Sequence, residues 1–150
     1  MAWVSITEND VRRRLNAGEL AALAKYETSD DSTGFKLADM ILEVVREVRG
    51  FVAGYASNTL GATDTAPNEL TNTIAVITRH LFLTTQPNKA LLTDHRVREY
   101  DRAYATLDLV TKGTFRVEEP ETASDATLPS PSPHFTETDP QYTRTQEDGI

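Results

Sequence analysis

FKLADMILEVVREVRGFVAGY, residues 35–55, is the most periodic stretch of the sequence. From its first leucine, apolar side chains recur at i, i+3, i+4, i+7, i+8, i+11, i+15 and i+18, the spacing of one helix face. The members of this stripe are Leu37, Met40, Ile41, Val44, Val45, Val48, Val52 and Tyr55. Charged residues fall off the stripe. The pattern predicts a long amphipathic helix that buries one side.

The residues ahead of this stretch predict two short helices that meet in a corner. Thr7 is a candidate N-cap, and the acids that follow it suit the positive end of a helix. We expect the run to break at Gly18, because glycine weakens a helix interior, and to restart over residues 19–26. A polar loop follows over residues 27–34.

Two more helices are expected behind the long one. A loop of small residues over 57–66 leads to Pro67, which suits the first position of a helix that closes near Gln86. The apolar surface of this helix is wide, so we expect it to be central; it comprises Leu70, Ile74, Ala75, Ile77, Leu81, Phe82 and Leu83. Thr93 and Gly113 mark the ends of the last helix. Its expected inner face comprises Val97, Tyr100, Tyr104, Leu107 and Thr111.

Short connections between helices favour antiparallel neighbours. The sequence therefore predicts an all-α fold, a small antiparallel bundle of three main helices plus two short N-terminal helices. A short extended segment is expected to follow the last helix over residues 114–117.

Most of the acidic charge lies at the end of the chain. The 150 residues carry a net charge of −8, yet residues 1–116 hold 15 acids against 14 bases. Residues 117–150 hold eight acids against one base, together with five of the seven prolines. We therefore divide the chain into a near-neutral helical domain, 1–116, and an extended acidic tail rich in Pro, Ser and Thr, 117–150.

Single apolar residues occur at intervals along this tail. A tail that only stays solvated normally avoids them, and proline lowers the entropy lost when an extended segment docks. We predict that the tail lies across a partner; the alternative is a plain disordered tail. The candidate anchors, two of them at the root of the tail, are Phe115, Val117, Leu128, Phe135, Tyr142 and Ile150.

Residue types that carry catalysis or bind cofactors are sparse. There is no cysteine, and the three histidines, His80, His95 and His134, share no i, i+4 spacing. No nucleophile-elbow, P-loop or dinucleotide-binding motif occurs. No apolar run reaches the ~20 residues of a membrane span. We expect a protein that is not an enzyme, with no cofactor, no metal and no membrane partner.

Arg12-Arg13-Arg14 is the one basic run. Val11 and Leu15 flank it on the packing side, so a solvated helix face explains it; the other interpretation is a contact with an acidic partner or with phosphate. The corner also leaves open a small helical DNA-binding or regulatory protein with a helix-turn-helix. Its second helix, however, offers mainly Ala and Leu, with Lys25 as its base.

Four features follow one another over residues 5–116. They are the short-helix pair, 7–26; the long helix ending VRGFVAGY, 48–55; the helix opened by PNEL, 67–70; and the last helix, RVREYDRA, 96–103, ending VTKG, 110–113. This layout resembles the small helical head–tail connector proteins of tailed bacteriophages, also called adaptor or head-completion proteins. The acidic tail lies outside the resemblance.

The resemblance implies a structural virion protein, made in the host cytoplasm and placed at the neck, at the capsid vertex. Members of the family form a ring, commonly of twelve copies, below the portal. There they prolong the DNA channel and present a docking surface. The implied partners are further copies of the chain in a dodecameric homo-oligomer, the portal protein, the next neck or tail protein, and DNA that passes without specific binding.

Overall fold

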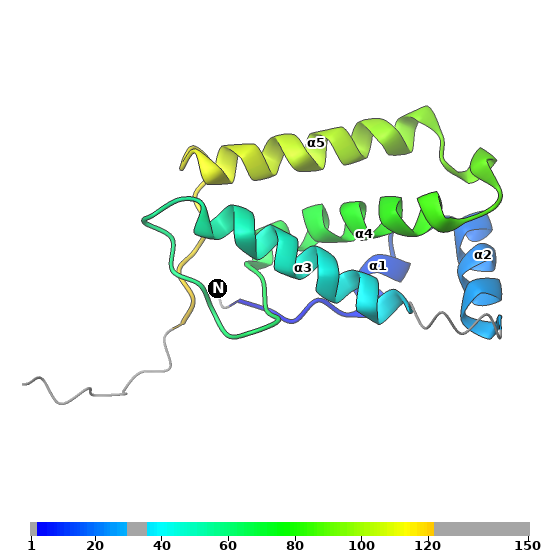
Figure 1. Ribbon diagram of the computed structural model, residues 1–150, viewed down its shortest axis with the longest axis horizontal. Helices are drawn as coiled ribbons and strands as arrows, with labels where there is room; N and C mark the ends of the chain where they lie inside the picture. Colours follow the sequence, from blue (N-terminus) through cyan, green and yellow to red (C-terminus); the bar gives the residue numbers. More distant parts are fainter. Residues whose placement is uncertain (1–2, 30–35, 122–150) are drawn as a thin grey trace, which may run out of the picture.

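The computed structural model describes residues 3–29 and 36–121. The elements in these residues are α1 Glu8–Arg12, α2 Ala17–Thr28, α3 Leu37–Ala53, the 3-10 turn η1 Asn68–Leu70, α4 Thr71–Thr85, the 3-10 turn η2 Lys89–Leu91 and α5 Asp94–Thr111. Figure 1 shows α4 running antiparallel to both α3 and α5, with α2 across one end. The predicted all-α bundle of three main and two short helices is confirmed.

Helix α3 buries the stripe that predicted it. Its buried residues are Leu37, Met40, Ile41, Val44, Val45, Val48 and Val52, on the side that packs against α4 and α5. Tyr55, the last predicted member, is an exception. The helix ends at Ala53, and Tyr55 lies beyond it with 37% of its surface exposed. Its ring lies against Gly113 instead of in the core.

Helix α4 is central, as its wide apolar surface predicts. It packs against α1, α3 and α5, and Ile74, Phe82 and Leu83 are almost fully buried. The predicted end of this helix near Gln86 is confirmed, since Gln86 is the C-cap. Pro67, in contrast, is not the first residue of α4. It is extended, with φ −57° and ψ 134°, and η1 separates it from the helix.

The inner face of α5 is rotated from the predicted one. Its buried residues lie at i, i+4 and i+7 and are Ala103, Leu107 and Val110. Val97, a predicted core residue, is 37% exposed. Tyr100 and Tyr104 are half-buried at the edge of the core. Large side chains drew the prediction away from Ala103, whose small methyl group is what faces inward.

Three further predicted helix ends are confirmed. Thr7 is the N-cap of α1, and the Asp10 carboxylate accepts a hydrogen bond from the Thr7 amide at 2.9 Å. Thr93 Oγ1 accepts from the Arg96 amide at 3.4 Å at the start of α5. At the other end Gly113 has φ 71°, in the left-handed region.

The break between the two N-terminal helices lies earlier than Gly18. The Asn16 side chain accepts from the Glu19 amide at 2.9 Å, and the Glu19 carboxylate accepts from the Asn16 amide at 2.8 Å. This reciprocal capping box starts α2 at Ala17, so Gly18 lies in the first turn. Helix α2 also runs to Thr28, into the predicted loop; residues 30–34 of that loop lie outside the described residues.

The N-terminal segment, the loop after α3 and the chain after α5 meet at one end of the bundle. The Trp3 indole N–H donates to the carbonyl of Glu118 at 3.1 Å, and the Arg49 guanidinium lies 5.2 Å from the Trp3 ring centre. Arg49 also donates to the carbonyls of Gly61, at 3.0 Å, and Thr65, at 2.7 Å. One arginine thus holds the predicted small-residue loop in place.

Candidate interaction site

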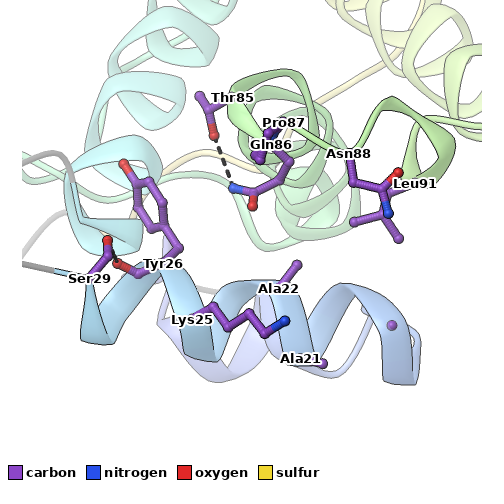
Figure 2. A pocket seen from close by; sticks show the side chains of 11 residues that line it. Ala21, Ala22, Lys25, Tyr26, Ser29, Thr85, Gln86, Pro87, Asn88 and Leu91 are labelled. Atoms are coloured by element: carbon purple, nitrogen blue, oxygen red, sulfur yellow. Dashed lines mark hydrogen bonds between the residues drawn. The ribbon is translucent and has the colours of Figure 1, made fainter. Parts of the chain in front are cut away.

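A cleft of about 630 Å³ opens between α2 and the connection from α4 to α5 (Figure 2). Its floor and walls combine small, apolar and uncharged polar side chains with one cation. The lining residues are Gly18, Ala21, Ala22, Lys25, Tyr26 and Ser29 on the α2 side and Thr85, Gln86, Pro87, Asn88 and Leu91 opposite. This volume is in the range of sites that hold small ligands or short peptide segments.

Gln86 is the buried polar side chain of the cleft. It is only 7% exposed, and its Nε2 donates to Thr85 Oγ1 at 3.3 Å. Figure 2 shows the carboxamide directed into the space above α2. A carboxamide has two N–H donors and a carbonyl acceptor. Among the described residues, its remaining hydrogen-bonding capacity therefore has no side-chain partner and is available to whatever fills the cleft.

An ion pair fixes the α2 wall to α5. Glu19 is fully buried, and Arg96 donates to both of its carboxylate oxygens, at 2.8 Å from Nε and 3.0 Å from Nη2. This two-point geometry sets the orientation of both side chains. Because the same carboxylate closes the capping box with Asn16, the start of α2 and its attachment to α5 depend on one residue.

The pair continues into α4 through Glu99 and Arg79. Glu99 Oε2 accepts from Arg96 at 2.9 Å and from Arg79, while Arg79 also donates to the carbonyl of Arg14 at 2.9 Å. Burial lowers the pKa of Arg79, which stays charged at any physiological pH. Burial would raise the pKa of Glu99, but the hydrogen bond from Arg96 and the two guanidinium charges together lower it.

Apolar contacts complete the attachment of α2. Leu23 is buried in the core, and the Tyr26 and Phe82 rings meet edge to face with centres 5.9 Å apart. On the outer side Glu27 accepts from Arg12 at 2.6 Å. The cleft is therefore bounded by a wall that the core and ion pairs both hold.

A smaller pocket of about 240 Å³ lies between α3, α4 and α5. His80 stacks on Tyr100 with ring centres 3.9 Å apart, and Tyr104 donates to Glu47 at 2.6 Å. Burial lowers the pKa of His80, so its imidazole is neutral near pH 7. Burial and the bond to Glu47 raise the pKa of Tyr104. These groups contact one another inside the bundle.

The predicted tail anchors fall into two groups. Phe115 and Val117 are half-buried and pack against the core of their own chain. The other four lie outside the described residues; they are Leu128, Phe135, Tyr142 and Ile150. Neither Phe115 nor Val117 lines the cleft, and the role of all six toward a partner stays a prediction.

The basic run is largely engaged within the chain. Arg12 bonds to Glu8 at 3.0 Å and to Glu27, and Arg14 donates to Asn72 at 2.9 Å. Arg13 is the exposed member. The flanking Val11 and Leu15 are buried, as predicted. The side chains of this corner therefore provide few of the phosphate or base contacts that a helix-turn-helix makes.

Sequence reasoning missed the cleft and the Glu19–Arg96 pair. The spacing Asn16-x-x-Glu19 is a capping-box signal that places the start of α2. Nothing local indicates that Glu19 also meets Arg96, because the two lie 77 residues apart. Within residues 3–29 and 36–121, no three acidic or histidine side chains are placed to hold a metal ion. In the same residues no helix has the length and apolar character needed to cross a membrane.

These observations define a small all-α protein whose candidate site is a cleft between helices, lined by apolar and polar side chains. The chain belongs to a bacteriophage family: the model described as "Bacteriophage Mu, Gp36" matches it over residues 6–132. The resemblance to phage proteins is thereby confirmed at the level of a phage family. No curated protein and no solved structure matches the chain.

The matched range also revises the boundary of the resemblance. The resemblance in the sequence covers residues 5–116 and excludes the acidic tail, whereas the family model continues to residue 132. The root of the tail and its first prolines thus belong to the family pattern. This stretch includes Pro129 and Pro131 but not the last acidic residues.

Proposed function

We propose that this chain is a structural virion protein that forms a ring at the phage neck, joins the portal to the downstream neck or tail proteins, and prolongs the DNA channel. The observation that carries the proposal is the match to a phage family over residues 6–132. The helical bundle and the tail that follows it suit a protein whose role is to contact other chains. We propose no catalytic activity and no cofactor for it.

The distribution of cations supports a channel through which DNA slides. DNA affinity grows with the number of phosphates that lysine and arginine neutralise. In the described residues many guanidinium groups already bind acceptors of their own chain, namely those of Arg12, Arg14, Arg49, Arg79 and Arg96. With residues 1–116 near neutral, a ring of such domains would hold DNA only weakly.

The path of the chain after α5 supports the tail as the contacting element. Trp3 binds the carbonyl of Glu118, and the Glu118 amide donates to Glu69 at 3.4 Å. Phe115 and Val117 seat the same stretch on the core. The root of the tail is therefore fixed to the bundle, and 29 residues follow Glu121 in the sequence.

The test is reconstitution with the portal protein of the same phage. Purified full-length chain is mixed with portal rings, and the product is examined by sedimentation and by electron microscopy. We expect a stoichiometric complex with an added ring at the portal. A chain that remains monomeric and never engages the portal would refute the proposal. The free chain alone does not decide, because such proteins can assemble only on the portal.

The DNA-binding alternative has its own measurement. The exposed residues of α2 include Leu20, Ala21, Ala24 and Lys25, a face with a single cation. We expect no salt-sensitive affinity for duplex DNA, that is, no binding that falls steeply as the salt concentration rises. A strong salt-dependent affinity would favour the regulatory protein instead.

A further inference from the structure

The cleft between α2 and the α4–α5 connection is built to receive an extended chain. Tyr26, Pro87 and Leu91 give it aromatic and apolar surface, and Gln86 offers a buried carboxamide with unused hydrogen-bonding capacity. Polyproline segments bind surfaces of this type, because their apolar rings pack on aromatic side chains while their carbonyls stay free to accept hydrogen bonds. The chemistry thus points to a proline-rich segment.

The charge of the cleft selects among such segments. Lys25 is part of the lining, Lys89 follows Asn88 directly, and none of the lining residues that the structure describes carries a carboxylate. A segment with acids on either side of its prolines would complement these ammonium groups.

The chain itself contains a segment of this kind. Residues 128–133 read LPSPSP, with Asp125 before them and Glu137 after them. The prolines reduce the conformational entropy lost on docking.

The root of the tail and the cleft lie at opposite ends of α4. Glu118 is held beside Glu69, next to the start of α4, whereas Gln86 and the cleft lie at the end of α4. Helix α4 has 15 residues, which corresponds to about 22 Å between the two places. An extended chain over residues 118–128 can span about 33 Å, so the length of the tail allows docking on its own bundle or on a neighbour, and it is the proposed ring that favours the neighbour. Figure 1 shows α2 at the end of the bundle away from the root of the tail. Contact between unlike ends of successive copies is the heterologous geometry that closes a ring.

We propose that the cleft between α2 and the α4–α5 connection holds residues 128–133 of a neighbouring copy of this chain. The inference rests on the proposed function in one respect, because it assigns a contact within the proposed ring. In that arrangement Gln86 donates to a tail carbonyl, Leu128 and the prolines cover the apolar wall, and the flanking acids lie near Lys25 and Lys89.

The absence of cysteine from the sequence makes a direct test possible. One full-length variant carries Ala21→Cys, at an exposed position in the cleft, and another carries Ser132→Cys, in the tail. The two are mixed under mild oxidation, with portal present and without it, and disulfide-linked heterodimers are measured by non-reducing electrophoresis and mass spectrometry. The matched control replaces Ala21→Cys by Ala105→Cys, an exposed alanine of α5 outside the cleft.

Docking holds the two thiols at a high effective concentration, so we expect the cleft pair to link at least about tenfold faster than the control pair. Adding Lys25→Glu to the cleft variant should lower the rate. Equal rates for the two pairs would overturn the inference. A chain carrying both Ala21→Cys and Ser132→Cys that forms its disulfide only within the same molecule would also overturn it. So would a cleft thiol that is protected from oxidation by added portal but not by a second copy of the chain.

This experiment separates the inference from the proposed function. If a ring forms on the portal but the cleft pair shows no preference, the neck role stands and the tail contact is wrong. If the cleft pair links between copies but the chain never engages the portal, the tail contact stands and the neck role is wrong.

Discussion

Gly113 and Gly50 have different backbone conformations and tolerate a side chain differently. Gly113 has φ 71°, and a Cβ there would lie 2.4 Å from the Tyr55 ring. Gly50 lies inside α3, where a Cβ would meet nothing within 4 Å. Only the first glycine is required by the backbone.

We expect Gly113→Ala to destabilise the chain by about 2 kcal/mol, because an L-residue is strained in the left-handed region and Tyr55 must move. Gly50→Ala, the matched control, should stabilise it by about 0.5–1 kcal/mol, since alanine favours a helix interior. Urea denaturation of both variants measures the two changes. Effects of the same sign would show that the end of α5 is not held as described.

At the scale of the element, α2 depends on Glu19. Glu19→Gln keeps the shape but leaves Arg96 without its buried charge partner, so we expect a loss of about 3 kcal/mol in the free energy of unfolding. The control is Glu8→Gln, which removes a carboxylate from Arg12 in an exposed pair and should cost under about 1 kcal/mol. Chemical denaturation followed by circular dichroism compares the two. Similar losses would mean that the buried pair does not fix α2.

The same network makes the attachment of α2 and α5 to α4 sensitive to acid. Glu99 has a pKa below its ordinary value of 4.5 in the folded chain, so the folded state favours its charged form. Its contribution to stability is therefore complete above the unfolded pKa and is lost as the pH falls through the lower, folded one. We expect Glu99→Gln to be less stable than the original chain at neutral pH, and the difference to shrink below about pH 4. A difference that stays constant across the titration would contradict this.

The helices differ in how well the sequence predicts which residues they bury. The α3 stripe is unambiguous, because large apolar residues repeat on one face, and seven of the eight predicted members are buried, with Tyr55 the exception. The inner face of α5 was predicted wrongly at Val97, because a long helix with few apolar residues lets a small one such as Ala103 face the core. Local caps could be read from residue types, as at Thr93 and Gly113.

The candidate site was less accessible from the sequence than the fold. Its walls come from segments around residues 18–29 and 85–91, and periodicity does not reveal which loop faces which helix. Nothing in the sequence marks Glu19 as a buried acid, since its partner Arg96 is distant in sequence. What the sequence did provide is the acidic, proline-rich tail, the proposed occupant of that cleft.

At the scale of the whole molecule, the boundary between folded domain and tail can be placed by truncation. In the described residues the core extends past the predicted boundary of 116, because Val117 packs on it, as Phe115 does just before that boundary. We expect a chain ending at Glu121 to melt at the same temperature as the full chain in dilute solution. A chain ending at Gly113 should lose about 2 kcal/mol, because it exposes the surface that the two residues cover.

Differential scanning calorimetry measures both truncations. Equal melting of the two would place the end of the domain at Gly113 and make residues 114–121 part of the tail. A large loss on cutting at Glu121 would show that the tail itself supports the fold.

Trp3 is the only tryptophan of the chain, and it lies where three distant segments meet. Its indole lies beside the Arg49 guanidinium, which holds the loop after α3, and its N–H binds the carbonyl of Glu118 at the root of the tail. The chain therefore contains an intrinsic fluorescent probe at its own point of attachment. Any partner that displaces the root of the tail changes the surroundings of this one indole, and a shift in emission wavelength reports that event without a label.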